Sequence, residues 1–185
     1  LQSFKIVENE KKYETIVPYY IAQIYYIQGK KEEAIAYAGQ KLKKGGGYYD
    51  VEMNQLLGHA HFERGEFEGA LPYLEAYVNK NKKVRREDLY ELSYCYYQAK
   101  QYPKAIEGFK QLSGKEDTLS QHAMYMLGDA YLKTGQKANA RNAYLFCASN
   151  SSSPALKEVS KYNYAKLSYE LGYQDIALKE MNTFI

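Results

Sequence analysis

Apolar and polar residues alternate along this chain in a pattern that is typical of short amphipathic helices. Between residues 123 and 132, for example, Leu127, Ala130 and Tyr131 are spaced i, i+3 and i+4, which places them on one face of a helix. A similar apolar period runs from residue 105 to 112. Four polar stretches separate such segments, and they are residues 44–47, 79–86, 113–118 and 149–154. The pattern therefore predicts an all-α chain.

The helical segments recur with a nearly fixed period. A glycine is followed five residues later by an alanine in four places, and a lysine replaces the glycine in a fifth. The five pairs are Gly29 with Ala34, Gly65 with Ala70, Lys100 with Ala105, Gly135 with Ala140, and Gly172 with Ala177. Successive alanines are 35 to 37 residues apart. Each period predicts two helices, because the glycine can adopt the left-handed conformation that ends one helix and the small alanine lets the next approach closely.

We therefore predict a single repeat array with ten main helices in five antiparallel pairs and no sheet. The predicted repeats are residues 15–48, 51–84, 86–118, 121–154 and 158–185, with residues 1–7 as a partial helix before them. The chain begins at Leu1 and not at a methionine, so we expect a fragment of a longer protein. Apolar residues at the array ends are expected to drive self-association or to be covered in the parent protein. They are Leu1, Phe4 and Val7 at one end and, in the last segment Thr183-Phe184-Ile185, Phe184 and Ile185 at the other.

The repeated segment resembles the tetratricopeptide repeat. That family has the pattern Leu-Gly-x-x-Tyr, then Ala-x-x-x-Phe, with a proline near the end of about 34 residues. The copies in this chain are Leu127-Gly128-x-x-Tyr131 with Ala140-x-x-x-Tyr144 and Pro154, Leu57-Gly58-x-x-His61 with Ala70-x-x-x-Leu74, Leu92-Ser93-x-x-Tyr96 with Ala105-x-x-x-Phe109, Ile21-Ala22-x-x-Tyr25 with Ala34-x-x-x-Ala38, and Tyr164-Ala165-x-x-Ser168 with Ala177-x-x-x-Met181. The resemblance covers the whole chain, and it implies a right-handed α–α superhelix, the tetratricopeptide solenoid.

Two other solenoid families have less support. Ankyrin repeats carry Thr-Pro-Leu-His, which this sequence lacks. Pentatricopeptide repeats bind RNA and would carry a basic groove, whereas the formal charge of this chain is +3. No apolar run approaches the roughly 18 to 20 residues that a membrane-spanning helix needs. We therefore expect no nucleic acid partner and no membrane span in this fragment.

Candidate catalytic and metal-binding residues are few, and each has a simpler structural interpretation. The glycine run 45–47 follows no strand and precedes no Gly-Lys-Ser/Thr, so it is predicted to be a loop between repeats. His59 and His61 are two residues apart on a helix and cannot hold one ion together, and His61 takes a packing position. Cys95 and Cys147 occupy small-residue positions and are predicted to be unpaired, slowly reacting core thiols. We predict no enzyme activity, no cofactor and no metal site.

A basic cluster lies in the polar stretch 79–86. Its members are Lys80, Lys82, Lys83, Arg85 and Arg86. A solvated loop is the favoured interpretation, and a docking patch for an anionic partner is the alternative.

The resemblance also implies where a partner binds. In tetratricopeptide proteins the first helix of each unit lines a concave groove, and peptides dock there. By repeat alignment the groove residues are Tyr19, Gln23, Tyr26, Gln55, His59, Phe62, Tyr90, Tyr94, Tyr97, Tyr125, Asp129, Tyr162, Lys166 and Tyr169. Nine of these fourteen are tyrosine or phenylalanine, which suits recognition because such rings offer large rigid contact area. We expect about a third of the tyrosines to pack against the next repeat, and Tyr90, Tyr94 and Tyr97 to form the centre of the contact surface.

One known mode of tetratricopeptide binding is not expected. Chaperone co-factors of this family clamp a C-terminal carboxylate with lysine and asparagine on the same face. The equivalent positions here hold Tyr19, Gln23, Gln55, Glu87 and Glu91. The clamp is therefore missing.

The leading functional prediction is a non-catalytic scaffold that binds a peptide or protein segment in the groove. The alternative is a carbohydrate-binding module of the bacterial cell envelope, which would need exposed tyrosines beside polar groups such as Gln55, Asp129 and Lys166. A pure spacer would need none of the groove tyrosines. Segments 17–26 and 164–171 resemble long tetratricopeptide proteins of Gram-negative bacteria, and that resemblance favours a periplasmic or cell-envelope location over the cytoplasm.

Overall fold

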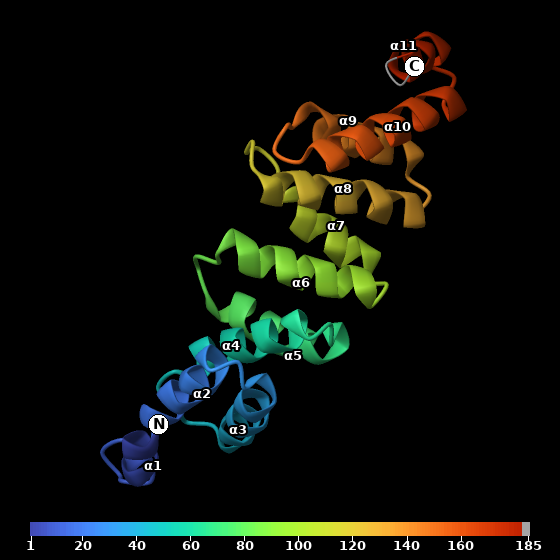
Figure 1. Ribbon diagram of the computed structural model, residues 1–185. Helices are drawn as coiled ribbons and strands as arrows, with labels where there is room; N and C mark the ends of the chain where they lie inside the picture. Colours follow the sequence, from blue (N-terminus) through green and yellow to red (C-terminus); the bar gives the residue numbers. More distant parts are fainter. Residues whose placement is uncertain (183–185) are drawn as a thin grey trace. The chain divides into compact units, whose positions relative to one another are not determined.

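The structure is a computed structural model, and it describes residues 1–182. Those residues form eleven α-helices and no strand (Figure 1). The all-α fold class and the five helix pairs predicted from the sequence are confirmed. No helix in the same residues is both long and apolar enough to cross a membrane. Thr183, Phe184 and Ile185, which were expected to form an exposed end of the array, lie outside the described residues.

The chain divides into two compact units, residues 1–95 and 96–185, and the division falls within helix α6. The helices of unit 1 are α1 (Gln2–Val7), α2 (Val17–Ile27), α3 (Lys31–Lys44), α4 (Asp50–Glu63), α5 (Phe67–Lys80) and the part of α6 (Arg86–Gln98) that ends at Cys95. α2 packs against α3 and α4, and α4 also packs against α5. α1 contacts α2 but buries none of its own residues. Its Phe4 ring lies 6.1 Å from the Tyr20 ring.

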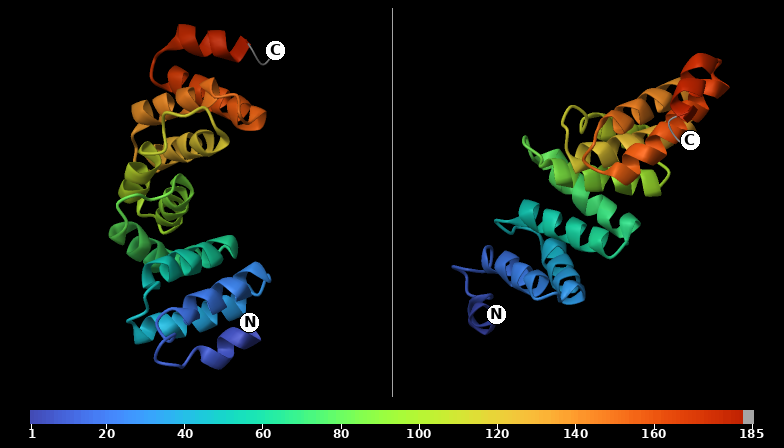
Figure 2. Two further views of the ribbon diagram at one scale, coloured as in Figure 1. Left: turned by 90° about the vertical axis from the view of Figure 1, so that its left-hand side faces the viewer. Right: turned by 45° about the horizontal axis from the view of Figure 1, so that its top comes forward.

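Unit 2 follows the same plan of paired helices. Its helices after α6 are α7 (Tyr102–Lys110), α8 (Thr118–Lys133), α9 (Lys137–Ser149), α10 (Pro154–Glu170) and α11 (Gln174–Met181). α8, α9 and α10 lie side by side (Figure 2), and each of these three contacts the other two. α7 packs against α8, and α11 packs against α10. Whether residues 1–185 form a single array with the predicted repeat boundaries stays a prediction.

Several helices begin with residues that suit a helix N-terminus. Pro18, Pro103 and Pro154 occupy the first or second position of α2, α7 and α10, where the missing N–H group has no helical partner to lose. The side chain of Asp117 caps α8 by accepting a 2.8 Å hydrogen bond from the backbone N–H of Ser120. The sequence therefore specifies these helix starts locally.

The turns inside the helix pairs have the predicted left-handed backbone. Gly29, Gly65, Gly135 and Gly172 have φ angles of 75°, 75°, 74° and 86°. Lys100 stands at the equivalent place between α6 and α7, and its φ is also positive, at 58°. An L-residue with a side chain is strained in this conformation, because its Cβ crowds the following carbonyl oxygen.

Small residues let the two helices of a pair approach closely. The alanines of the repeat are Ala34, Ala70, Ala105, Ala140 and Ala177, and each is at most 5% exposed. A Cβ added to Gly58 in α4 would lie 2.6 Å from the Leu74 side chain in α5. One added to Gly128 in α8 would lie 2.8 Å from the Tyr144 ring in α9. Both distances are too short for two carbon atoms, so a larger residue at either position would have to displace its neighbour.

A buried glutamine fixes the connection between α9 and α10. The Nε2 group of Gln121 donates to the backbone oxygens of Asn150, Ser153 and Cys147 at 2.7, 3.1 and 3.2 Å. Its Oε1 accepts a 2.6 Å hydrogen bond from the Ser153 N–H. Gln121 thus satisfies backbone groups that the end of α9 would otherwise leave without partners. The repeat pattern of the sequence does not predict this role.

Both cysteines are unpaired and fully buried, as their small-residue positions predicted. Burial raises the pKa of the Cys95 thiol to about 12. Burial also raises the pKa of Cys147, whose sulfur accepts a 2.9 Å hydrogen bond from the Ser160 hydroxyl. Slow reaction of these thiols stays a prediction, which follows from their low thiolate content and poor access.

Candidate interaction surface

Side chains from consecutive first helices meet at a spacing of one repeat. In unit 1 the ring of Tyr26 in α2 lies 5.8 Å from that of His59 in α4. Phe62 in α4 lies 5.7 Å from Tyr94 in α6. These pairs are 33 and 32 residues apart, about one helical turn less than the period of 35 to 37 residues, so each ring contacts a residue one turn before its own equivalent in the next repeat. We call the surface formed by α2, α4 and residues 86–95 of α6, on the side away from the second helices, the first-helix face of unit 1.

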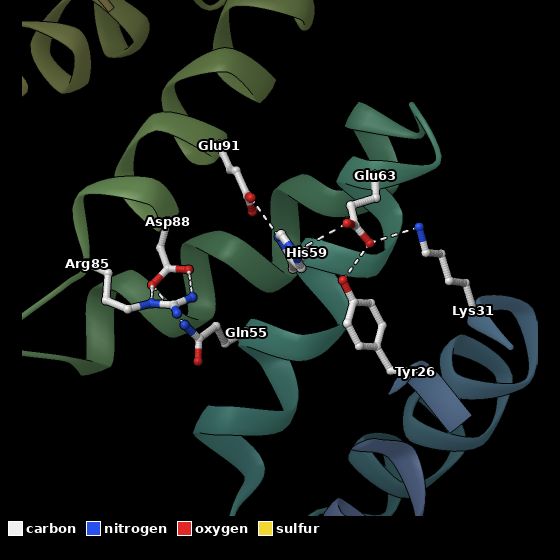
Figure 3. Close-up of polar contacts among 8 residues, drawn as sticks. All are labelled: Tyr26, Lys31, Gln55, His59, Glu63, Arg85, Asp88 and Glu91. Atoms are coloured by element: carbon white, nitrogen blue, oxygen red, sulfur yellow. Dashed lines mark hydrogen bonds and ion pairs between the residues drawn. The ribbon is translucent and has the colours of Figure 1, made fainter. Parts of the chain in front are cut away.

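A chain of polar contacts runs across this face (Figure 3). The Nδ1 atom of His59 lies 2.6 Å from Oε1 of Glu91, and its Nε2 atom lies 3.7 Å from Oε1 of Glu63. Oε2 of Glu63 accepts a 2.5 Å hydrogen bond from the Tyr26 hydroxyl and forms a 2.9 Å ion pair with Lys31. The chain therefore connects α2 and α3 to α4, and α4 to α6.

The contacts change the protonation of the groups involved. The hydrogen bond to Glu91 raises the pKa of the half-buried His59, although burial by itself lowers it. Burial opposes ionisation of Glu63, but hydrogen bonds from Tyr26 and Lys31 hold its pKa below the usual value. Burial and the bond to Glu63 raise the pKa of the Tyr26 hydroxyl. Tyr26 therefore stays a hydrogen-bond donor, and Glu63 stays ionised, at neutral pH.

A second polar cluster lies one helical turn away. The carboxylate of Asp88 is only 1% exposed and binds Arg85 through two hydrogen bonds of 2.7 and 2.8 Å. Gln55 in α4 donates a third hydrogen bond of 2.8 Å to Asp88. Burial opposes the charge, yet these donors lower the pKa of Asp88. Arg85 of the predicted basic cluster is thus engaged within the protein, whereas Lys82 and Lys83 are exposed.

Glu91 has fewer partners than its environment requires. The residue is 7% exposed, and its Oε1 contacts His59. Its Oε2 is buried and has no hydrogen-bond partner, and within residues 1–182 no other buried side-chain nitrogen or oxygen is in that state. The sequence marked Glu91 only as a place where a clamp residue was missing. The signal in the sequence is that Glu91 stands directly before Leu92, at a position where α6 packs against its neighbours.

The aromatic residues predicted for the centre of the surface are half-buried and contact one another. Tyr94 lies edge-on to Phe62 and Phe67, at 5.7 and 5.2 Å, and Tyr90 stacks on Tyr94 at 6.2 Å. Burial raises the pKa of Tyr90 to about 12. These rings therefore stabilise unit 1 and also present part of their area at its surface.

The remaining predicted residues of unit 1 belong to a second aromatic group. The Tyr19 ring lies 5.0 Å from Tyr49 and 5.6 Å from Tyr20, and its hydroxyl accepts a 2.7 Å hydrogen bond from Gln23. Tyr48, which the sequence analysis did not select, lies beside Tyr49 at 4.9 Å and is 73% exposed. The Gly45–Gly47 run joins α3 to α4 immediately before this group.

In unit 2 the predicted residues fall into two groups. Tyr97 donates a hydrogen bond to Asp129 in α8 and lies 5.6 Å from Tyr102, while Tyr125 lies 5.7 Å from the buried Tyr144. The other group is on α10, and its members Tyr162, Lys166 and Tyr169 are exposed. Tyr162 and Tyr169 are 49% and 67% exposed.

The histidines do not converge on an ion. His61 packs flat against Tyr73, with 5.6 Å between ring centres, and its Nδ1 lies 2.7 Å from Oε2 of Glu66. The packing interpretation of His61 is confirmed. In the part of the chain that the structure describes, no three His, Cys, Asp or Glu side chains are arranged to hold a metal ion.

Comparisons with known proteins agree with this architecture. A family model described as "Tetratricopeptide repeat" matches residues 56–112, and another with the same description matches residues 121–150. No curated protein matches the sequence. Among solved structures, YrrB is 14% identical with a TM-score of 0.73, covering 97% of this chain and 89% of that chain. MamA is 20% identical with a TM-score of 0.67, covering 88% and 91%. A putative kinesin light chain of Podosopora anserina, with TPR-like repeats, is 18% identical with a TM-score of 0.59, covering 90% of each chain.

These likenesses are to the fold. The architecture is that of a helical repeat protein. Its helix pairs have left-handed turns, cross closely at glycine or alanine, and place their first helices in register. The matching family models and the structural relatives specify the kind: the chain is a tetratricopeptide repeat protein.

Proposed function

We propose that this chain is a non-catalytic interaction scaffold that binds a peptide or protein segment on its first helices. The observation that carries the proposal is the recurrence of half-buried aromatic side chains at equivalent positions of successive first helices, where they lie one repeat apart. Rings held in this way offer rigid contact area and lose little conformational entropy on binding. The related structure of YrrB is described as that of "a TPR protein with an unusual peptide-binding site", which supports the same class of function.

The proposed surface is described separately in each unit. In unit 1 it comprises Tyr19, Gln23, Tyr26, Gln55, His59, Phe62, Tyr90 and Tyr94. In unit 2 it comprises Tyr97, Tyr125, Asp129, Tyr162, Lys166 and Tyr169. Several of these side chains already have partners within the protein. Such contacts preorganise the rings and reduce the entropic cost of binding.

Alanine substitution of Tyr94 and Tyr97 tests the proposal. Peptides would be selected from a phage-displayed library of random dodecamers on the intact chain, then synthesised and titrated by fluorescence polarisation. The Y94A/Y97A double variant should bind them more weakly by well over roughly tenfold, since each ring contributes about 1–2 kcal/mol at such a site. F146A is the matched control, because Phe146 is a 45% exposed ring on the second helix α9.

Each other outcome has a distinct meaning. Circular dichroism must show that the double variant keeps its helix content. Loss of helicity would mean that the rings act chiefly in packing. If the double variant is folded and binds the selected peptides with wild-type affinity, the binding surface does not lie on the first helices.

Carbohydrate binding remains the second candidate, and one feature favours it. On α10 the exposed Tyr162 and Tyr169 flank Lys166 at spacings of four and three residues, so two rings and an ammonium group share one helix face. Gln55 and Asp129, by contrast, are already hydrogen-bonded within the protein. A glycan array probed with the intact chain and with Y162A/Y169A would support this candidate only if binding occurs and depends on those rings.

A further inference from the structure

We propose that the first-helix face of unit 1 selects basic segments, and that the carboxylate of Glu91 receives a lysine or arginine side chain of the bound peptide beside His59. This inference rests on the proposed function, because it names the chemistry of the peptide that the scaffold binds.

The unsatisfied oxygen of Glu91 is the observation that points to a ligand. Its neighbour Asp88, on the same helix, is even more buried, but both of its oxygens accept hydrogen bonds from Arg85 and Gln55. Glu91 is 7% exposed and has one contact, to His59, while Oε2 has none. A buried carboxylate oxygen without a donor is costly, since it has lost water and gained nothing in exchange. A guanidinium or ammonium group entering beside the His59 ring would supply the missing donor.

The charges around Glu91 favour a cation. Lys31 offsets Glu63, and Arg85 offsets Asp88. Glu91 has only His59, which provides a full positive charge only when it is protonated. Two exposed carboxylates extend the negative character along the same helices: Glu52 lies seven residues before His59, and Glu87 lies four before Glu91. The face is therefore acidic although the whole chain has a formal charge of +3.

The rings beside Glu91 and His59 suit an organic cation better than a metal ion. Tyr26 contacts His59 from α2, and Phe62 and Tyr94 lie on the helices that carry His59 and Glu91. Aromatic faces attract lysine and arginine side chains through cation–π contacts, and a guanidinium also stacks flat on a ring. A metal ion would need several ligands at one point, and residues 1–182 contain no such group. Nucleic acid would be repelled by the same carboxylates.

Four pools of fluorescein-labelled dodecapeptides test the inference. Each pool is random except at its centre, which is fixed as arginine, lysine, alanine or glutamate. The intact chain should bind the arginine and lysine pools at least about tenfold more tightly than the alanine pool, and the glutamate pool most weakly. E91Q keeps the shape of the side chain but removes its charge, so it should reduce the preference for arginine over alanine to below about threefold.

A second variant protects the test against misfolding of E91Q. E52Q/E87Q alters two exposed residues and should weaken binding of the basic pools by about threefold, because only the long-range field changes. E33Q/E68Q is the matched control, since it makes the same charge change at exposed positions of the second helices α3 and α5. An equal loss in the control would show a nonspecific charge effect and overturn the inference.

The remaining outcomes separate this inference from the proposed function. If the alanine pool binds and the basic pools bind no better, selection of basic segments is wrong while the scaffold function stands. If none of the four pools binds, both are wrong. If folded E91Q keeps the full preference for arginine, Glu91 is not the recognition residue, and the inference fails.

Discussion

Lys100 shows how a single residue can depart from its repeat and still keep the turn. Within residues 1–182 it alone has a positive φ without being glycine, and it occupies the place that glycine holds in the other helix pairs. The surrounding helices impose the conformation, and the side chain adapts at a cost in strain.

Substitution of Lys100 by glycine should therefore stabilise the protein. The left-handed conformation costs a side-chain-bearing residue about 1–2 kcal/mol, and glycine loses about 0.5–1 kcal/mol through the greater freedom of its unfolded chain. K100G should raise the free energy of unfolding by about 0.5–1 kcal/mol in urea titrations. The opposite kind of change, from glycine to a residue with a side chain, is G135A at the equivalent turn, and it should lower the free energy of unfolding by a similar or larger amount. A destabilised K100G would show that Lys100 has contacts worth more than its strain.

His59 should make unit 1 sensitive to pH. Its pKa is raised in the folded protein, chiefly by the hydrogen bond to Glu91, so its stabilising contribution is complete below the unfolded pKa of about 6.5 and is lost as pH rises through the folded pKa. The groups that act on it are Tyr26 of α2, Glu63 of α4, and Asp88 and Glu91 of α6. The difference in free energy of unfolding between wild type and H59Q should fall as the pH rises above the unfolded pKa of about 6.5. A difference that does not vary with pH would contradict this.

At the level of the helices, the sequence predicted what depends on local pattern. The helix pairs follow from apolar periodicity, and the turns follow from glycine, because both are determined within about ten residues. The polar chain of the interaction surface could not be predicted in the same way. Tyr26 and His59 were selected by alignment, but their partners Glu63 and Glu91 were not. Those partners are fixed by how neighbouring first helices pack, which a single repeat does not reveal.

The close crossing of α8 and α9 leads to a prediction at the same scale. G128A should destabilise the protein by about 1–2 kcal/mol, because the new methyl group would overlap the Tyr144 ring and the overpacking outweighs the better helix propensity of alanine. G39A is the control: its Cβ would be 3.9 Å from the nearest atom, the Tyr73 hydroxyl, so alanine should stabilise α3 by about 0.5–1 kcal/mol. Thermal unfolding of the two variants should shift in opposite directions. Equal shifts would show that helix packing does not decide the effect.

For the molecule as a whole, the fold is that of a tetratricopeptide repeat protein, and in the proposed scaffold function the choice of partner depends on side chains. The period of the repeats and the family pattern indicated the class of protein. The sequence also predicted an aromatic surface, and its rings are half-buried in unit 1 and exposed on α10. The acidic character of the first-helix face of unit 1 was hidden by the net positive charge of the chain. Composition averages over surfaces, whereas recognition depends on one of them.

The contacts between consecutive first helices also make the order of the repeats matter. Each joint has two dissimilar halves: Tyr26 meets His59 and Glu63, Phe62 meets Tyr94, and Tyr97 meets Asp129. Removing one whole repeat would preserve the helical period, yet it would bring together first helices whose contacting side chains are not complementary. The side-chain contacts between neighbouring repeats are therefore specific to each pair of repeats, and one repeat cannot replace another. A change in the number of repeats would also require substitutions on both sides of the new contact.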